Sequence, residues 1–79
     1  MEKKIVISKG TIKGKFKGFK NSHTVFELSS GQIWRQNEAK FMNYFSVNPE
    51  VEIISKDGKN YLEISAHGVL EAVEVIRIK

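Results

Sequence analysis

The chain has 79 residues, no cysteine, a formal net charge of +4, and 41% hydrophobic and 10% aromatic residues. This length accommodates a single domain over residues 1–79. The lack of cysteine excludes a disulfide framework, a cysteine-based zinc site and a thiol nucleophile. No apolar run approaches the roughly 18 residues that a membrane span requires.

The charge is unevenly distributed along the chain. Residues 1–20 contain seven lysines and one glutamate, a net charge of +6, whereas residues 21–79 have a net charge of −2. The N-terminal segment lacks the roughly 7–15-residue apolar core of a signal peptide. Two alternatives remain open: a cytoplasmic protein, or an exported one whose leader is absent.

The segment 9–19, KGTIKGKFKGF, alternates with a period of two, which predicts a β-strand. One face of this strand is basic and carries no aromatic residue of its own. It consists of Lys9, Thr11, Lys13, Lys15 and Lys17, with Lys20 and Arg35 near it. The opposite face carries Ile12, Gly14, Phe16 and Gly18. The next residues, FKNSH, predict a turn because Asn and Ser side chains bond to the backbone.

Two alternating runs flank Ser29-Ser30-Gly31, which predicts a hairpin with a three-residue turn. This register pairs Phe26 with Trp34 and Thr24 with Gln36, and it places Leu28 on their face. Val25, Glu27, Ile33 and Arg35 form the more polar face. We therefore expect Trp34 to be a core residue.

The alternation stops between Asn37 and Pro49. Phe41 and Phe45 have the spacing of one face of a helical turn, and Asn37 is a suitable cap. Pro49 ends any such helix. The segment predicts a short helical turn, or an irregular connection, that lays aromatic rings on the sheet.

A second hairpin is predicted around Asp57-Gly58, a strong signal for a two-residue turn. Its apolar members include Val51, Ile53, Ile54, Tyr61 and Ile64. His67-Gly68 predicts another turn, and AVEVIRIK is expected to form the last strand.

These elements predict an all-β protein of five or six short strands. A small, strongly bent antiparallel barrel is the economical arrangement, because closure removes exposed sheet edges. An SH3-like barrel is the first expectation and an OB-like barrel the alternative. The expected core consists of Phe16, Phe26, Leu28, Trp34, Val51 and Ile53.

The sequence also resembles an uncharacterised family of small bacterial proteins and domains with the signature T-x-F-x-L-x-N-G-Q-x-W-x-Q. The resemblance covers about residues 10–78. The matching residues are Gly14, Phe16, Gly18, Phe19, Thr24, Phe26, Leu28, Gly31, Gln32, Trp34, Gln36, Pro49, Val51 and Ile53. Ser30 stands where the family has Asn. The resemblance implies a small β fold and no assigned activity, and family members often follow a secretion signal.

Catalysis and metal binding have little support in the sequence. His23 and His67 both lie beside turn residues, Asp57 is needed by its turn, and no serine lies in a nucleophile elbow. The glutamates mostly occupy outward strand positions, and a small filled barrel offers no obvious cleft for paired carboxylates. We expect no enzyme activity, no catalytic residue, no metal and no cofactor.

Two surfaces are candidates for binding. The aromatic cluster Phe41, Tyr44 and Phe45, extended by Val25 and Ile33, either caps the core or contacts a protein partner or a second copy. The basic face, Lys9, Lys13, Lys15 and Lys17 with Arg35, either protects a strand edge or contacts nucleic acid. The first hypothesis is a non-catalytic interaction module that uses the aromatic segment or a sheet edge. A nucleic-acid-binding module is the alternative, and a hydrolase-like enzyme is a distant third.

Overall fold

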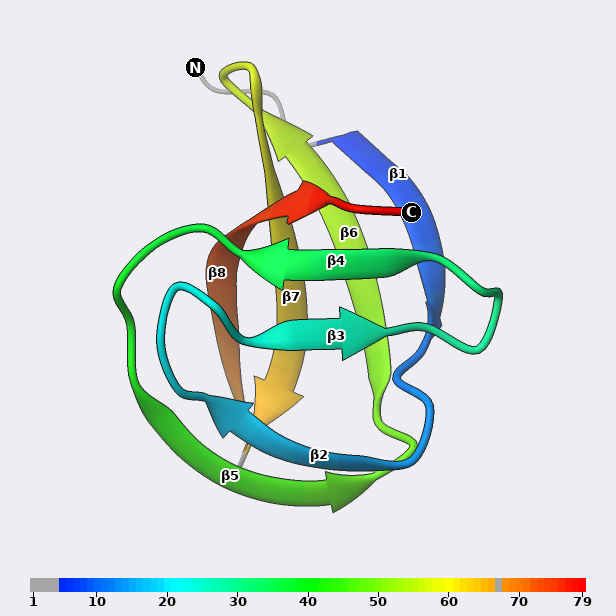
Figure 1. Ribbon diagram of the computed structural model, residues 1–79, viewed down its shortest axis with the longest axis vertical. Coiled ribbons are helices and arrows are strands. Elements are labelled where there is room, and N and C mark those ends of the chain that lie inside the picture. Colours follow the sequence, from blue (N-terminus) through cyan, green and yellow to red (C-terminus); the bar gives the residue numbers. More distant parts are fainter. Residues whose placement is uncertain (1–4, 67) are drawn as a thin grey trace.

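The computed structural model describes residues 5–66 and 68–79, and this part of the chain contains eight strands and no helix. The strands are β1 (Ile5–Thr11), β2 (Lys15–Phe19), β3 (Val25–Glu27), β4 (Ile33–Gln36), β5 (Met42–Val47), β6 (Glu50–Lys56), β7 (Lys59–Ala66) and β8 (Val69–Arg77) (Figure 1).

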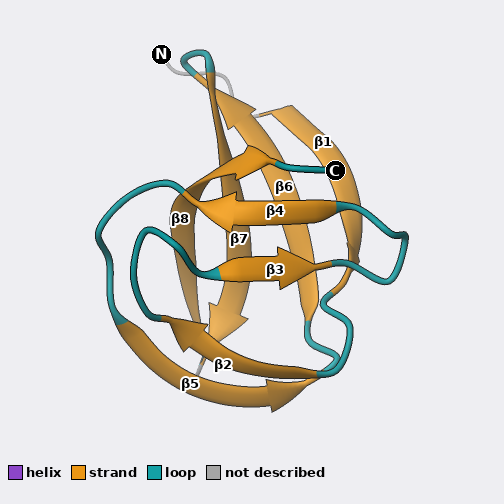
Figure 2. Cartoon of the chain, viewed as in Figure 1, coloured by secondary structure: helices purple, strands orange, loops and turns teal. Residues whose placement is uncertain are grey.

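Six strands form one antiparallel sheet in the order β1-β6-β7-β8-β4-β3, and β2 and β5 form a second, two-stranded sheet. The six-stranded sheet curves into a half-barrel, and the β2–β5 pair closes its lower end in the view of Figure 2. The expectation of an all-β, small and strongly bent antiparallel barrel is confirmed. The expected number of five or six strands is wrong, because the described residues form eight. The additional strands come from segment 9–19, which is divided at Gly14, and from residues 42–47, which were not expected to form a strand.

The first hairpin has the expected register. Phe26 pairs with Trp34, and the Gln36 amide donates a 2.7 Å hydrogen bond to the Thr24 carbonyl. The three-residue turn is closed by a 2.9 Å hydrogen bond from the Gly31 amide to the Leu28 carbonyl. A short glycine-containing turn therefore sets which face of β3 and β4 is buried.

The second hairpin also turns where the sequence indicates. Lys56 pairs with Lys59 across Asp57 and Gly58, whose φ angles are 53° and 78°. Positive φ at both central residues is the geometry of a type I′ turn, which matches the twist of the flanking strands. The next expected turn involves His67, which lies outside the described residues.

The core lies between the two curved walls. It contains Ile12, Phe16, Phe19, Phe26, Leu28, Trp34, Val51, Ile53, Leu62, Ile64, Val73 and Val75. All six residues expected in the core are among them. Phe16, Phe19 and Phe26 pack against one another with ring centroids 5.9–6.1 Å apart, a spacing typical of favourable aromatic pairs.

The segment 37–49 differs from the prediction. The sequence predicts a short helical turn or an irregular connection, but residues 42–47 form β5, and its side chains alternate between half-buried and exposed. Side chains four residues apart lie on the same face of a helix, and they also lie on the same face of a strand because four is an even number. Phe41 and Phe45 therefore have a spacing that fits one face of either structure.

The segment 9–19 also differs, because it forms two strands rather than one. The chain bends between β1 and β2 at Lys13 and Gly14, and Gly14 has a φ of 83°. Within the β2–β5 pair the register then shifts between Phe16 and Gly18. The lysines of this segment consequently lie on different walls of the barrel.

Candidate functional site

The outer face of the β2–β5 pair combines basic and apolar side chains. Lys15 lies directly opposite Val47. The register shift leaves Lys17 opposite the two residues Tyr44 and Phe45. We define the β2–β5 face by its exposed basic and apolar members, Lys15, Lys17, Lys20, Phe41, Phe45 and Val47, with the polar Asn43 exposed among them.

The two phenylalanines of this face are largely open to solvent. Phe41 is 70% exposed and Phe45 is 61% exposed. They are four residues apart, which is about 13 Å along an extended strand. Large aromatic side chains this exposed form a patch that the fold itself does not need, which is typical of a contact surface.

The three lysines of this face have no acidic partner among the described ion pairs. The two segments that form the face, 12–26 and 39–49, contain no Asp or Glu. The Lys20 ammonium group lies 5.2 Å from the centre of the Phe41 ring. Lys17 and Lys20 therefore lie beside exposed aromatic rings, Lys15 lies opposite Val47, and none of the three lysines has a described acidic partner.

A small surface hollow, which we call the slot, borders this face between β2 and β3. The two strands are tied together at one end by a 2.8 Å hydrogen bond from the Lys13 amide to the Glu27 carbonyl. At the other end, the Thr24 hydroxyl accepts hydrogen bonds from the amides of Lys20 and Asn21. No described hydrogen bond joins β2 to β3 between these ends.

The slot has a volume of about 240 Å³. Its lining combines core residues with basic and small side chains at the surface. The lining residues are Ile12, Lys15, Phe16, Lys17, Gly18, Lys20, Thr24, Val25 and Phe26. An apolar hollow with cationic groups at its surface suits an apolar group with negative charge beside it.

The loop that precedes β5 is held firmly. The buried amide of Gln36 donates 2.9 Å hydrogen bonds to the carbonyls of Glu38 and Lys40. The Glu38 carboxylate accepts a 2.6 Å hydrogen bond from the Glu74 amide, and the Lys40 ammonium group donates one to the Ala72 carbonyl. These bonds fix the chain immediately before Phe41, so that ring projects from an ordered loop.

The structure separates the residues predicted to contact nucleic acid. Lys15 and Lys17 line the slot, but Lys9 and Lys13 form ion pairs with Glu52 and Glu27 at 3.6 and 3.8 Å. Arg35 lies on β4 directly opposite Val25, at the far side of the slot. Lys20, which the sequence placed only near the basic face, is a full member of the β2–β5 face.

The predicted partner-binding residues are also divided. Phe41 and Phe45 are exposed, whereas Tyr44 lies on the inner face of β5 and packs against Phe16 with ring centroids 6.2 Å apart. Val25 is exposed beside the slot, and Ile33 is half-buried on the next strand. The basic face of segment 9–19 carries no aromatic residue of its own, but Phe45 on β5 and Phe41 in the loop before β5 lie beside Lys17 and Lys20.

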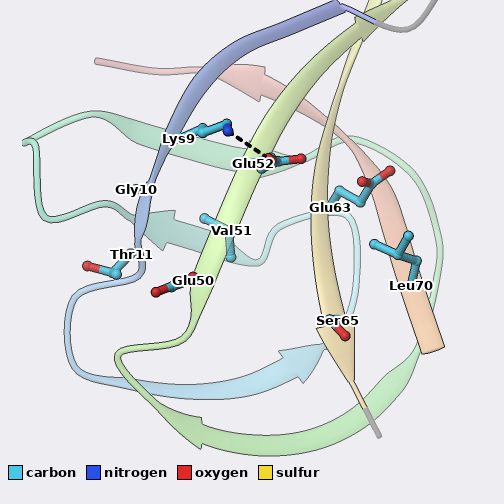
Figure 3. A pocket seen from close by; sticks show the side chains of 9 residues that line it. All are labelled: Lys9, Gly10, Thr11, Glu50, Val51, Glu52, Glu63, Ser65 and Leu70. Atoms are coloured by element: carbon cyan, nitrogen blue, oxygen red, sulfur yellow. Dashed lines mark ion pairs between the residues drawn. The ribbon is translucent and has the colours of Figure 1, made fainter. Parts of the chain in front are cut away.

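A second hollow lies on another wall of the barrel. This acidic groove, of about 490 Å³, runs over β1, β6, β7 and the start of β8 (Figure 3). It is lined by Lys9, Gly10, Thr11, Glu50, Val51, Glu52, Glu63, Ser65 and Leu70. The expectation of no cleft is thus wrong, but the carboxylates of the groove make it a poor place for an anion.

Neither wall contains a recognisable metal centre, since the described residues include no group of three or more His, Asp or Glu suited to a metal ion. Within residues 5–66 and 68–79 there is also no helix with the length and hydropathy of a membrane span. Comparisons with protein-family models, curated proteins and solved structures found no match. The resemblance drawn from the T-x-F-x-L signature therefore stays a prediction.

Proposed function

We propose that this protein is a non-catalytic interaction module that binds an extended anionic chain across the β2–β5 face. The observation that carries this proposal is the arrangement of Lys15, Lys17 and Lys20 beside Phe41 and Phe45, on strands that leave these side chains exposed. Lysine ammonium groups attract an anionic ligand, and phenyl rings stack on its planar groups. Neither interaction requires a chemical step.

The basic and the aromatic surfaces, which were predicted separately from the sequence, lie on one face of the fold. The basic residues alone are explained by protection of a strand edge, and the aromatic residues alone by a cap on the core. Neither explanation covers cations and aromatic rings that share one exposed face. An anionic chain with planar or apolar groups satisfies both kinds of side chain at once.

The test is fluorescence anisotropy with a labelled, mixed-sequence single-stranded oligonucleotide of about 12 nucleotides as the anionic probe. A variant with Lys15→Gln, Lys17→Gln and Lys20→Gln is expected to bind at least about tenfold more weakly at about 50 mM salt. The matched control, Lys9→Gln, Lys13→Gln and Lys59→Gln, removes the same charge from lysines that form ion pairs elsewhere. An equal loss in both variants would show that only net charge matters and would refute the face.

A protein partner or a second copy is the second candidate. It is favoured by the topology of β5, which pairs only with β2 and leaves its other edge open in the described chain. Main-chain pairing at an open edge is a common mode of peptide recognition. Light scattering over a wide concentration range tests the second copy, and a constant monomer mass would exclude it.

A further inference from the structure

We infer that the slot between β2 and β3 holds one unpaired nucleobase of a single-stranded nucleic acid, with the flanking phosphates on Lys15, Lys17 and Lys20. This inference rests on the proposed function and names its ligand. In the same complex, Phe41 and Phe45 stack against neighbouring bases.

The lining and the size of the slot suit a nucleobase. Its floor consists of buried apolar side chains, Ile12, Phe16 and Phe26, and its surface is rimmed by lysines. The volume of about 240 Å³ lies below the roughly 300–1,000 Å³ of most drug-sized ligand pockets. The slot is therefore small for a drug-sized ligand, and a single ring system such as a nucleobase is a ligand of suitable size.

The second argument is the order of charges and rings along the face. Lys15 and Lys17 are two residues apart, which is about 6–7 Å along a strand, and Lys20 follows at the end of β2. Phe45 lies beside Lys17 in the register, and Phe41 lies beneath Lys20. A single strand presents phosphates and base rings in the same alternation, and aromatic stacking tolerates any base sequence.

The third argument separates this ligand from other anionic chains. An acidic peptide would neutralise the lysines but would leave the slot and the two exposed rings without planar partners. A duplex keeps its bases paired and stacked, so a base would first have to be unpaired at a cost of a few kcal/mol. Of these three ligands, the unpaired strand is the one that matches the charges, the rings and the slot together.

The test compares four probes of equal length by anisotropy: single-stranded DNA, single-stranded RNA, an abasic oligonucleotide and poly-glutamate. The base-containing strands are expected to bind at least about tenfold more tightly than the abasic strand, which keeps the phosphates but lacks the rings. Equal binding of the abasic strand or of poly-glutamate would overturn the inference and leave the anionic-chain proposal standing. If the protein binds none of the four probes, both the inference and the anionic-chain proposal are refuted.

Two variants locate the base contacts. Phe45→Ala is expected to weaken binding of the base-containing strands by about 5- to 150-fold and to leave abasic binding unchanged. Leu70→Ala is the matched control, because Leu70 is 62% exposed but lies in the acidic groove. An equal effect of Phe45→Ala on the abasic strand would contradict stacking. Thermal unfolding checks that both variants remain folded.

The slot itself is tested by nuclear Overhauser contacts between oligonucleotide base protons and the protein. Val25 and Thr24 line the slot and both carry methyl groups, so the protons of a base within the slot are expected to contact these methyl groups. Contacts of bases with Phe45 but none with Val25 or Thr24 would show that the bases only stack on the surface, which would overturn the assignment of the slot.

Discussion

The ammonium group of Lys20 lies 5.2 Å from the centre of the Phe41 ring, and this contact joins the end of β2 to the loop before β5. An exposed cation–π contact of this kind contributes about 0.5–1 kcal/mol. The pairing of β2 with β5 places the basic and the aromatic candidate surfaces on one face, and this contact lies within that face.

The salt dependence of binding is predicted from the number of free lysines. Three phosphate contacts to a single strand give a slope of about −2 for log K against log salt concentration. The variant Lys17→Gln is expected to reduce the slope by about 0.7, whereas Lys9→Gln leaves it unchanged. A slope near zero in the parent protein would contradict phosphate contacts on this face.

Trp34 is expected to hold the first hairpin on the core. Its side chain is 3% exposed, it pairs with Phe26, and its indole Nε1 donates a 3.2 Å hydrogen bond to Oε1 of Gln32. Trp34→Ala is predicted to lower the free energy of unfolding by about 3–5 kcal/mol, measured by urea denaturation. A loss below about 1 kcal/mol, the range of surface substitutions, would show that the ring does not support the core.

Gly18 is expected to be intolerant of any side chain. It has a φ of 92°, and a Cβ atom there would collide with the carbonyl oxygen of Met42 on β5. Gly18→Ala is predicted to cost more than about 2 kcal/mol, because the collision adds to the 1–2 kcal/mol of left-handed strain.

Two other glycines serve as controls for this substitution. Gly14 has a φ of 83° but open space around it, so Gly14→Ala reports backbone strain alone, about 1–2 kcal/mol. Gly10 has open space and no positive φ, and Gly10→Ala is expected to leave stability unchanged or slightly raised. Equal losses for Gly18→Ala and Gly14→Ala would show that β2 and β5 do not approach closely.

Gln36 is predicted to order the loop that carries Phe41. Gln36→Leu removes both donors to the Glu38 and Lys40 carbonyls, which leaves those groups without these partners. The expected cost is about 1–3 kcal/mol, with faster amide hydrogen exchange over residues 37–41. Asn43→Ala, at an exposed position on β5, is the control. Unchanged exchange in Gln36→Leu would mean that other contacts order the loop.

Local patterns in the sequence predicted much of the fold. The hairpins at Ser29-Ser30-Gly31 and Asp57-Gly58 turn where expected, because short turns specify both their own geometry and the register of their strands. The buried face of β3 and β4, with Phe26 and Trp34, then follows from alternation alone. These features depend on residues that are close in sequence.

The binding face was harder to predict because it depends on pairing between distant segments. Nothing local shows that β5 lies beside β2, or that Phe45 therefore lies beside Lys17. The bend at Gly14 and the register shift at Lys17 also break the regular alternation that the lysines of segment 9–19 display. Only the folded arrangement shows that Lys9 and Lys13 lie apart from Lys15 and Lys17.

Binding of an anionic single strand at the β2–β5 face is measured residue by residue in a ¹⁵N–¹H titration with a mixed-sequence single-stranded oligonucleotide. The account predicts that amide shifts change at Lys15, Lys17, Val25 and Phe45, while those of Glu52 and Glu63 in the acidic groove remain constant. Shifts confined to the groove, or no shift at low salt, would contradict it.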